Sequence, residues 1–247
     1  MGAVKLAKRS LDIGLFSDNP AMPDYYQHTL GLPFVEAIEH SATYQEMFFE
    51  VNGASLKINQ STEPMGDGVS GYCGLVIATD TVSEPQHLTD PDGLRIELVP
   101  VGYEGITQFG IICRVPDADR QRSFLIESLG AEEMPGGVRI GDIPMRLEEA
   151  PIERSTPTWR RGFNYYVVFA ADGPRAHQQL LDAGAEHAVP PLKLMDRCVF
   201  SWVRDPSGNW IELVQYADIA GPLPEVDPID QHWAEIVRWR EDGVAFG

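Results

Sequence analysis

Apolar runs that end in aspartate open four segments of the chain. Each run reads as a buried strand closed by a loop or a capping residue. After three of the runs, apolar residues recur at helical spacing and the stretch ends at a glycine, which is typical of a glycine-capped helix. The runs occupy 11–18, 73–80, 109–117 and 165–172, and the helical stretches occupy 23–30, 118–129 and 174–183.

Hairpins follow the helical stretches. Asn52-Gly53 between the strand-like runs 44–51 and 54–59 predicts a tight type I′ turn. A second hairpin joins 198–203 to 210–215, and a shorter one joins 138–140 to 145–147. The pattern therefore predicts four strand–helix–hairpin units, of which the second, ending at Val99, has lost its helix. A gap near 102–105 divides the units into two pairs.

One ten-residue phrase occurs twice. It reads DPDGLRIELV at 90–99 and DPSGNWIELV at 205–214, with seven of ten positions identical, which indicates a duplicated unit. Aspartate, proline and glycine at these spacings are typical of a tight turn. The strand after the turn places one acid, Glu97 or Glu212, among apolar neighbours.

Composition limits the choice of partners. The chain has 247 residues, 43% of them hydrophobic, and a formal net charge of −18, which disfavours nucleic acid and acidic membranes as partners. It shows neither a secretory signal nor a membrane span. Three separated cysteines read as buried free thiols, so we expect a cytoplasmic protein. The tail, 217–247, predicts one helix with Asp227 as its N-cap and Pro228 as its first residue.

Units that end in DPxGxxIELV, with helices that close in Leu30-Gly31 and Leu129-Gly130, resemble the vicinal oxygen chelate superfamily. That superfamily includes glyoxalase I, bleomycin and fosfomycin resistance proteins, methylmalonyl-CoA epimerase and extradiol dioxygenases. The resemblance covers about 10–216 and implies an α+β fold of paired βαβββ modules. We therefore expect two open half-barrel domains, 10–102 and 103–216, followed by the tail. The resemblance leaves a homodimer open, and it indicates the fold rather than the activity.

The resemblance also implies a metal site built from two histidines on first strands and one glutamate on a final strand. Glu212 and Glu97 match the glutamate, whereas none of the six histidines lies on a first strand. The first-strand positions hold instead Leu11 or Asp12, Tyr72 or Cys73, Gln108 or Gly110, and Tyr165. We therefore predict no histidine-based metal site in either half, with Gln108 left as an alternative ligand.

In two of the four units, a basic residue occupies the final-strand position that holds a glutamate in the other two. Aligning the hairpins puts Lys57 at this position in the first unit and Arg146, or Met145 one register away, in the third. If consecutive units pair, Lys57 would face Glu97 and Arg146 would face Glu212. A buried carboxylate needs a partner, so a side-chain cation would fill the space that a metal holds in relatives.

These features predict a small-molecule-binding protein or enzyme with a degenerate metal site and a cavity in the C-terminal barrel. Glu212 lies on a dry strand face between Trp210 and Val214, where an acid has a raised pKa or a specific partner. It would act as a general base, with Tyr165 as hydrogen-bond donor to a developing oxyanion and Gln108 beside them. Structural pairing of Glu212 is the alternative. The substrate, an apolar or aromatic molecule, would contact Trp210, Trp202, Phe200 and Arg146, although core packing would explain the aromatic residues too.

The second functional hypothesis keeps a metal. The chain would then be an extradiol-type dioxygenase or a glyoxalase-type lyase or isomerase, in which Glu212 and Gln108 bind iron, manganese or zinc with a third ligand that the sequence does not identify. No other cofactor is predicted, because the chain has no nucleotide-binding or hydrolase motif.

Overall fold

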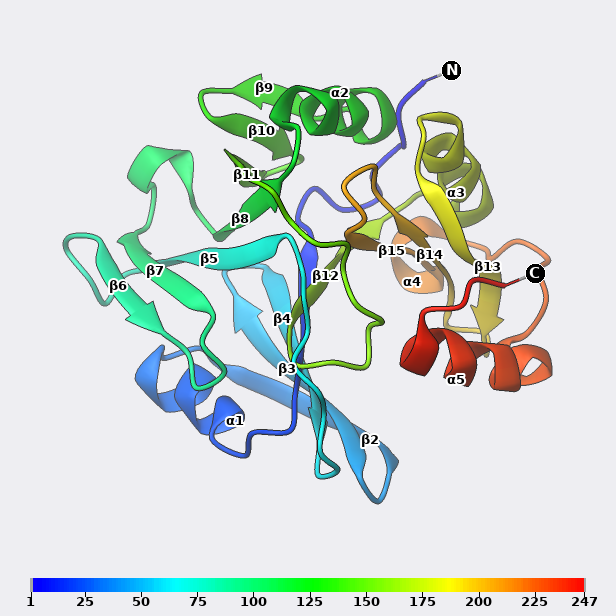
Figure 1. Ribbon diagram of the computed structural model, residues 1–247, viewed down its shortest axis with the longest axis horizontal. Helices are drawn as coiled ribbons and strands as arrows, with labels where there is room; N and C mark the ends of the chain where they lie inside the picture. Colours follow the sequence, from blue (N-terminus) through cyan, green and yellow to red (C-terminus); the bar gives the residue numbers. More distant parts are fainter. Residues whose placement is uncertain (1, 247) are drawn as a thin grey trace.

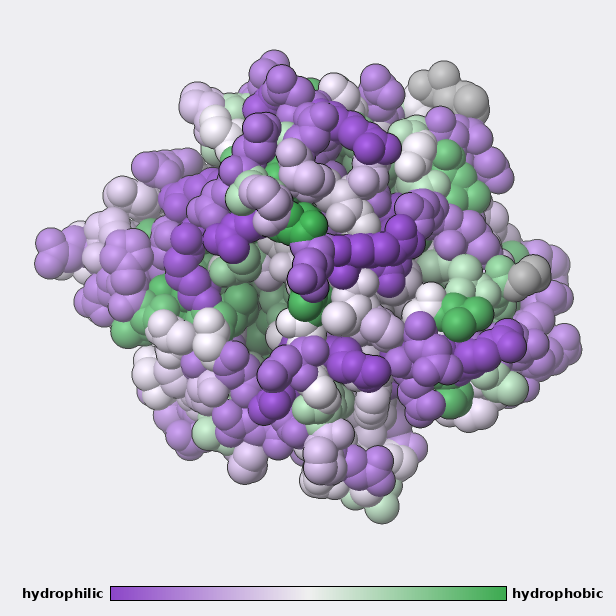
Figure 2. Space-filling model, in the orientation of Figure 1, coloured by the Kyte–Doolittle hydropathy of each residue, from purple (hydrophilic) through white to green (hydrophobic). Residues whose placement is uncertain are grey.

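Two mixed, open β-sheets form the body of the protein (Figure 1). The computed structural model describes residues 2–246. The eight-stranded sheet has the order β13-β14-β15-β12-β1-β4-β3-β2, and the seven-stranded sheet has the order β6-β7-β5-β8-β11-β10-β9. No helix in 2–246 is long and apolar enough to cross a membrane. Figure 2 shows a mostly polar face, hollowed between β5–β7 and the segment that leads into β12, with hydrophobic residues on the floor.

The four predicted units are present. The first contains β1 (Asp12–Ser17), α1 (Met22–Asp24) with the π-helical turn Tyr25–Thr29, β2 (Phe34–Ser41), β3 (Tyr44–Val51) and β4 (Ala54–Ser61). The second contains β5 (Tyr72–Thr79), β6 (Gln86–Thr89) and β7 (Arg95–Pro100), and a short 3-10 helix follows at Tyr103–Gly105. The third contains β8 (Phe109–Val115), α2 (Ala118–Leu129), β9 (Glu132–Met134), β10 (Gly137–Ile140) and β11 (Ile143–Glu149). The fourth contains β12 (Gly162–Phe169), α3 (Gly173–Asp182), β13 (Glu186–Leu194), β14 (Cys198–Arg204) and β15 (Trp210–Tyr216).

The pairing of the units differs from the sequence prediction. Strand β1 pairs antiparallel with β12, and β5 pairs antiparallel with β8, so the first unit joins the fourth and the second joins the third. The prediction that the first unit pairs with the second and the third with the fourth is wrong, because all four first strands are apolar and the sequence does not distinguish their partners. The limits 10–102 and 103–216 stay a prediction, since each range contributes strands to both sheets.

The repeated phrase forms the turn that the sequence predicts. Asp90 Oδ1 accepts from the backbone N–H groups of Asp92 and Leu94, and Asp205 accepts in the same way from Ser207 and Asn209. Gly93 and Gly208 have φ of 92° and 87°, a conformation that favours glycine.

Strand alternation separates the two larger of three apolar clusters. The larger one lies between the two sheets and α1–α3, and it takes alternate residues such as Tyr166 and Val168 of β12. The smaller one lies on the opposite, concave face of the eight-stranded sheet and includes Tyr165 and Trp202. The tail completes this smaller cluster with α5 (Trp233–Asp242), which follows α4 (Ala217–Ala220) and a 3-10 turn at Ile229–His232. The predicted tail helix exists, but it starts after the 3-10 turn rather than at Pro228.

Candidate functional site

Each sheet combines one acid and one cation at equivalent positions of its final strands. Lys57 of β4 and Glu212 of β15 belong to the eight-stranded sheet, and Glu97 of β7 and Arg146 of β11 belong to the seven-stranded sheet. The expected pairs Lys57–Glu97 and Arg146–Glu212 are wrong. They are exchanged because the first unit joins the fourth, so that Lys57 acts on Glu212 and Arg146 binds Glu97.

Glu212 lies among apolar residues on the concave face, where its own side chain is partly exposed. Its strand neighbours on that face are the buried Trp210 and Val214, and its cross-strand partner is Trp202. Burial raises the pKa of Glu212 to about 7; Lys57 opposes this rise, while Glu46 and Asp12 add to it. Within 2–246 no side chain or backbone group donates a hydrogen bond to its carboxylate. The carboxyl therefore exchanges its proton near neutral pH and keeps its lone pairs free.

Lys57 is the cation of this face. Its side chain is 16% exposed, and its Nζ lies 3.4 Å from Glu46 Oε1 and 5.2 Å from the centre of the Tyr165 ring. Burial alone would lower the pKa of Lys57, but Glu46, Tyr165 and Glu212 together raise it well above its usual value. Burial likewise acts against the charge of Glu46, yet Lys57, followed by His40 and Tyr44, lowers the pKa of that carboxyl. Lys57 and Glu46 are thus both charged at neutral pH.

Tyr165 fits against the backbone of β1. It pairs with Gly14 in the sheet register, and a Cβ added at Gly14 would lie 2.1 Å from the Tyr165 ring. Asn59 Nδ2 lies 3.3 Å from the Tyr165 hydroxyl, and burial raises the pKa of that hydroxyl. Tyr165 therefore stays protonated. The sequence indicates this close approach, because Gly14 is a lone glycine inside an apolar strand.

Sequence reasoning missed three polar residues beside Lys57. The Tyr44 hydroxyl donates toward Asn59 Oδ1 at 2.8 Å and Glu46 Oε1 at 3.1 Å. These residues share one face of the β3–β4 hairpin, because side chains alternate between the two faces of a strand. The period of two identifies this face in the sequence, although not its use.

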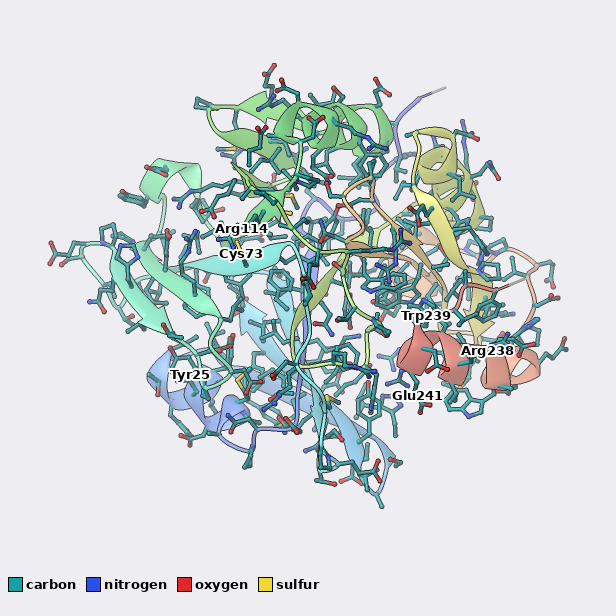
Figure 3. All side chains as sticks on the ribbon, in the orientation of Figure 1. Tyr25, Cys73, Arg114, Arg238, Trp239 and Glu241 are labelled. Atoms are coloured by element: carbon teal, nitrogen blue, oxygen red, sulfur yellow. The ribbon has the colours of Figure 1, made fainter. Side chains whose placement is uncertain are left out.

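Aromatic side chains fill the rest of the concave face. Ring centres lie 4.5 Å apart for Tyr165 and Trp202, 4.9 Å for Trp202 and Trp239, and 5.4 Å for Trp210 and Trp239. Phe200 is half-buried against the same cluster. Figure 3 shows Trp239 on the side of α5 that faces the sheet and Glu241 on the opposite side. Helix α5 thus covers the face that carries Glu212.

Two predicted site residues lie elsewhere. Gln108 precedes β8 in the seven-stranded sheet, and its Nε2 donates to the backbone oxygen of Asn52 at 2.7 Å. Arg146 donates to Glu97 and Glu104 at 2.9 and 3.1 Å. Of the predicted catalytic residues, the structure brings together Glu212 and Tyr165 and separates Gln108 from them; it also separates Arg146, a predicted substrate contact.

The residues around Glu212 do not fit the divalent metal that the sequence resemblance implies. Within 2–246, no group of three histidine, cysteine, aspartate or glutamate side chains has the arrangement of a metal site. An ammonium group acts on Glu212, and Asp12 is engaged by Lys8 and by the backbone of Ser55. Divalent metal ions prefer neutral imidazoles and carboxylates as ligands. A neighbouring ammonium group repels the metal ion.

Comparison with known proteins supports the fold. No family model and no curated protein matches the sequence. Glyoxalase I from Zea mays matches with a TM-score of 0.68 and 15% identity, over 85% of this chain and 94% of that one. The "putative dioxygenase" of Bacillus subtilis matches with a TM-score of 0.64 and 16% identity, over 96% of both chains. The cppA protein of Streptococcus pneumoniae matches with a TM-score of 0.50 and 13% identity, over 86% of this chain and 99% of that one. At these identities the likeness concerns the fold alone, and the predicted paired-module architecture is confirmed.

Proposed function

We propose that this chain, which has the vicinal oxygen chelate fold, binds a small aromatic molecule on the concave face of its eight-stranded sheet and exchanges a proton with it without a metal. The observation that carries this proposal is the environment of Glu212, whose carboxyl has a pKa of about 7 and faces a lysine ammonium in place of imidazoles. Its three cysteines, Cys73, Cys113 and Cys198, are free thiols, which supports the expectation of a reducing, cytoplasmic setting.

Each residue has a role that follows from its charge at neutral pH. Lys57 supplies a fixed positive charge that attracts an oxygen substituent of the ligand, such as a phenolate or a carboxylate. Tyr165, protonated at neutral pH, donates a hydrogen bond to an oxyanion. Glu212 accepts the proton, because a base with a pKa near the working pH combines a free lone pair with a useful driving force.

The ring of the ligand would take the place of the Trp239 indole ring. Trp239 packs against Trp202 and Trp210 and is 3% exposed. The proposal therefore requires α5 to move aside. Trp239 binds the sheet through packing, since its indole Nε1 has no hydrogen-bond partner within 2–246. An aromatic ligand offers contacts equivalent to those of Trp239. Moving α5 also breaks the hydrogen bond from Trp159 N–H to Arg240 O, 3.0 Å long.

Binding of phenols and aromatic carboxylates to chelator-treated protein tests the proposal. We expect saturable calorimetric binding without metal, weakened at least about tenfold by Lys57→Met, since a charged partner is lost. Glu212→Gln should keep binding and remove its dependence on pH around 7. Glu127→Gln, at an exposed position of α2, is the matched control.

Binding measured after addition of metal ions gives the result that would contradict the proposal. The proposal fails if no phenol or aromatic carboxylate binds, or if binding requires Fe(II), Mn(II) or Zn(II) and Glu212→Gln abolishes it. The metal-dependent dioxygenase, lyase or isomerase of the second hypothesis predicts that result. Its proposed ligand Gln108 directly precedes a strand of the other sheet, so the second hypothesis draws no support from the arrangement of these residues.

A further inference from the structure

A cleft of about 330 Å³ lies between the two sheets and away from the concave face that carries Glu212. It borders the first copy of the repeated turn and the chain that leads into β12, where Figure 2 shows the hollow. In Figure 3, Cys73 of β5 marks one edge of this region. Its volume falls in the range of small-molecule sites.

The floor of the cleft is apolar. Tyr72 and Phe163 are each 2% exposed, with ring centres 5.0 Å apart, and Leu15 and Met22 are each 1% exposed. These side chains line the cleft from four elements, β1, α1, β5 and β12. These side chains present a small apolar surface to the cleft, on which a ring or a short hydrocarbon body would lie.

The rim of the cleft is acidic. Asp67, Asp90 and Asp92 line it, and Arg161 is the one basic residue in the lining. Arg161 is already neutralised, because its Nη2 lies 2.8 Å from Asp67 Oδ1 and its Nε lies 3.5 Å from Asp18 Oδ1. Asp92 Oδ2 is buried and accepts no hydrogen bond from residues 2–246. A buried carboxylate oxygen without a donor is costly, so this position favours a ligand that brings one.

The second copy of the turn shows how the chain fills the equivalent place. There, the Arg204 guanidinium donates to Ser155 and Gly208 carbonyls at 2.7 and 2.8 Å, and Arg204 is 6% exposed. Asn209 Oδ1 accepts from the backbone of Gly71 at 2.8 Å. At an offset of 115 residues, the first copy has Thr89 and Leu94 in place of Arg204 and Asn209.

We propose that the cleft at the first copy binds a small organic cation, an ammonium or guanidinium group on an apolar body. The cationic head would lie at Asp92, where it supplies the donor that Oδ2 lacks, and the body would lie on Tyr72 and Phe163. Asp90 adds negative charge beside the head, while its own oxygens stay bonded to backbone N–H groups and to the Tyr26 hydroxyl. The ligand then provides at the first turn the kind of charge that Arg204 provides at the second. This site is independent of the proton exchange proposed for Glu212.

Methionine-methyl NMR on the full chain tests this proposal with benzylamine, benzyl alcohol and benzoate at neutral pH. Met22 lines the cleft, and Met195, 71% exposed and outside the lining, serves as the internal reference. We expect benzylamine to shift the Met22 signal saturably and to leave Met195 unchanged, with weaker binding of the alcohol and none of benzoate.

Two variants make the test specific. Asp92→Asn should weaken benzylamine binding at least about tenfold, because it removes a charged acceptor without removing a hydrogen bond of the fold. Thr89→Arg, which copies the second turn, should abolish binding by placing the chain's own guanidinium there. The exposed Asp80→Asn is the control.

Three results would overturn the proposal. They are no Met22 shift with benzylamine, benzoate binding as strong as that of benzylamine, and unchanged affinity in Asp92→Asn. The second result would assign recognition to Arg161 and an anion instead.

Discussion

Arg146 Nη1 lies 2.9 Å from Glu97 Oε2, across the seven-stranded sheet and at the positions that Lys57 and Glu212 occupy in the eight-stranded sheet. The same pairing of units therefore brings one cation to one acid in both sheets. The two sites differ in how closely the cation approaches the acid. Arg146 contacts Glu97 directly, whereas Lys57 contacts Glu46 and acts on Glu212 from beyond ion-pair distance.

The Arg146–Glu97 pair should matter for stability. The Glu97 side chain is 12% exposed and the Arg146 side chain 34%, so Arg146→Met would leave a mostly buried carboxylate with only Arg95, 3.7 Å away. We expect a loss of about 1–2 kcal/mol in the free energy of unfolding, measured by urea denaturation. Removal of Glu97 as well, in Arg146→Met/Glu97→Leu, should restore part of it.

A surface ion pair is the matched control for this prediction. Arg154 pairs with Glu186, and both side chains are more than half exposed. Arg154→Met should change the free energy of unfolding by about 0.5 kcal/mol or less. Equal effects of Arg146→Met and Arg154→Met would mean that the fold does not need a cation beside Glu97.

Glu212 and Glu46 should respond to pH in opposite directions. The pKa of Glu212 rises from its usual 4.5 to about 7 in the folded state, so the folded protein binds more protons between these values and stability falls as pH rises through them. At about 1.4 kcal/mol per pKa unit, a rise of about 2.5 units makes the penalty above pH 7 at most about 3.5 kcal/mol. Glu212→Gln should therefore be more stable than the wild type at pH 8 and equally stable near pH 4.

Glu46 provides the contrast. Its pKa lies below its usual value in the folded state, because Lys57, His40 and Tyr44 outweigh the effect of burial. Its stabilisation is present above the unfolded pKa and is lost as pH falls toward the folded one. Glu46→Gln should destabilise the protein at pH 8, measured by the same urea denaturation. If Glu46→Gln and Glu212→Gln shift stability at pH 8 in the same direction, the assignment of charges on this face is wrong.

Local signals in the sequence predicted the units, the turns and the individual strand faces. The Asp90 and Asp205 turns and the Asn52-Gly53 turn depend on neighbouring residues only, so their patterns are sufficient. The partner of each unit depends on contacts between residues far apart in the chain. The apolar run of β1 would pack equally well beside β5 or β12, and no short-range rule separates these choices.

The same limit explains the candidate site. Glu212 and Tyr165 lie on adjoining strands of one unit, and the sequence already placed them together. Lys57 was expected opposite the wrong acid, and Gln108 in the wrong sheet, because both expectations depended on the pairing of units. Helix α5, which covers the site, has an apolar stripe that indicates burial without indicating the surface it meets.

Gly14 should be the least replaceable residue of β1. A Cβ there would lie 2.1 Å from the ring of Tyr165, which is 1% exposed and has no room to move. We expect Gly14→Ala to lower the free energy of unfolding by about 2–3 kcal/mol, from thermal and urea denaturation. In a Tyr165→Ala background the same change should cost much less, because the clash is gone. Additive effects of the two substitutions would contradict the close approach.

The paired histidines His177 and His187 should make stability depend on pH at the other end of the fourth unit. Their facing ring nitrogens lie 3.1 Å apart, and burial, followed by the charge of His187, lowers the pKa of His177 from 6.5 to about 4. Between these values the unfolded chain binds the proton that the folded chain refuses, so stability falls as pH drops. From pH 7.5 to pH 5 the loss attributable to His177 is at most about 2 kcal/mol. His177→Gln should flatten this part of the profile in urea denaturation, whereas His28→Gln, at a 65% exposed side chain, should not. An unchanged profile in His177→Gln would show that His177 titrates normally in the folded protein.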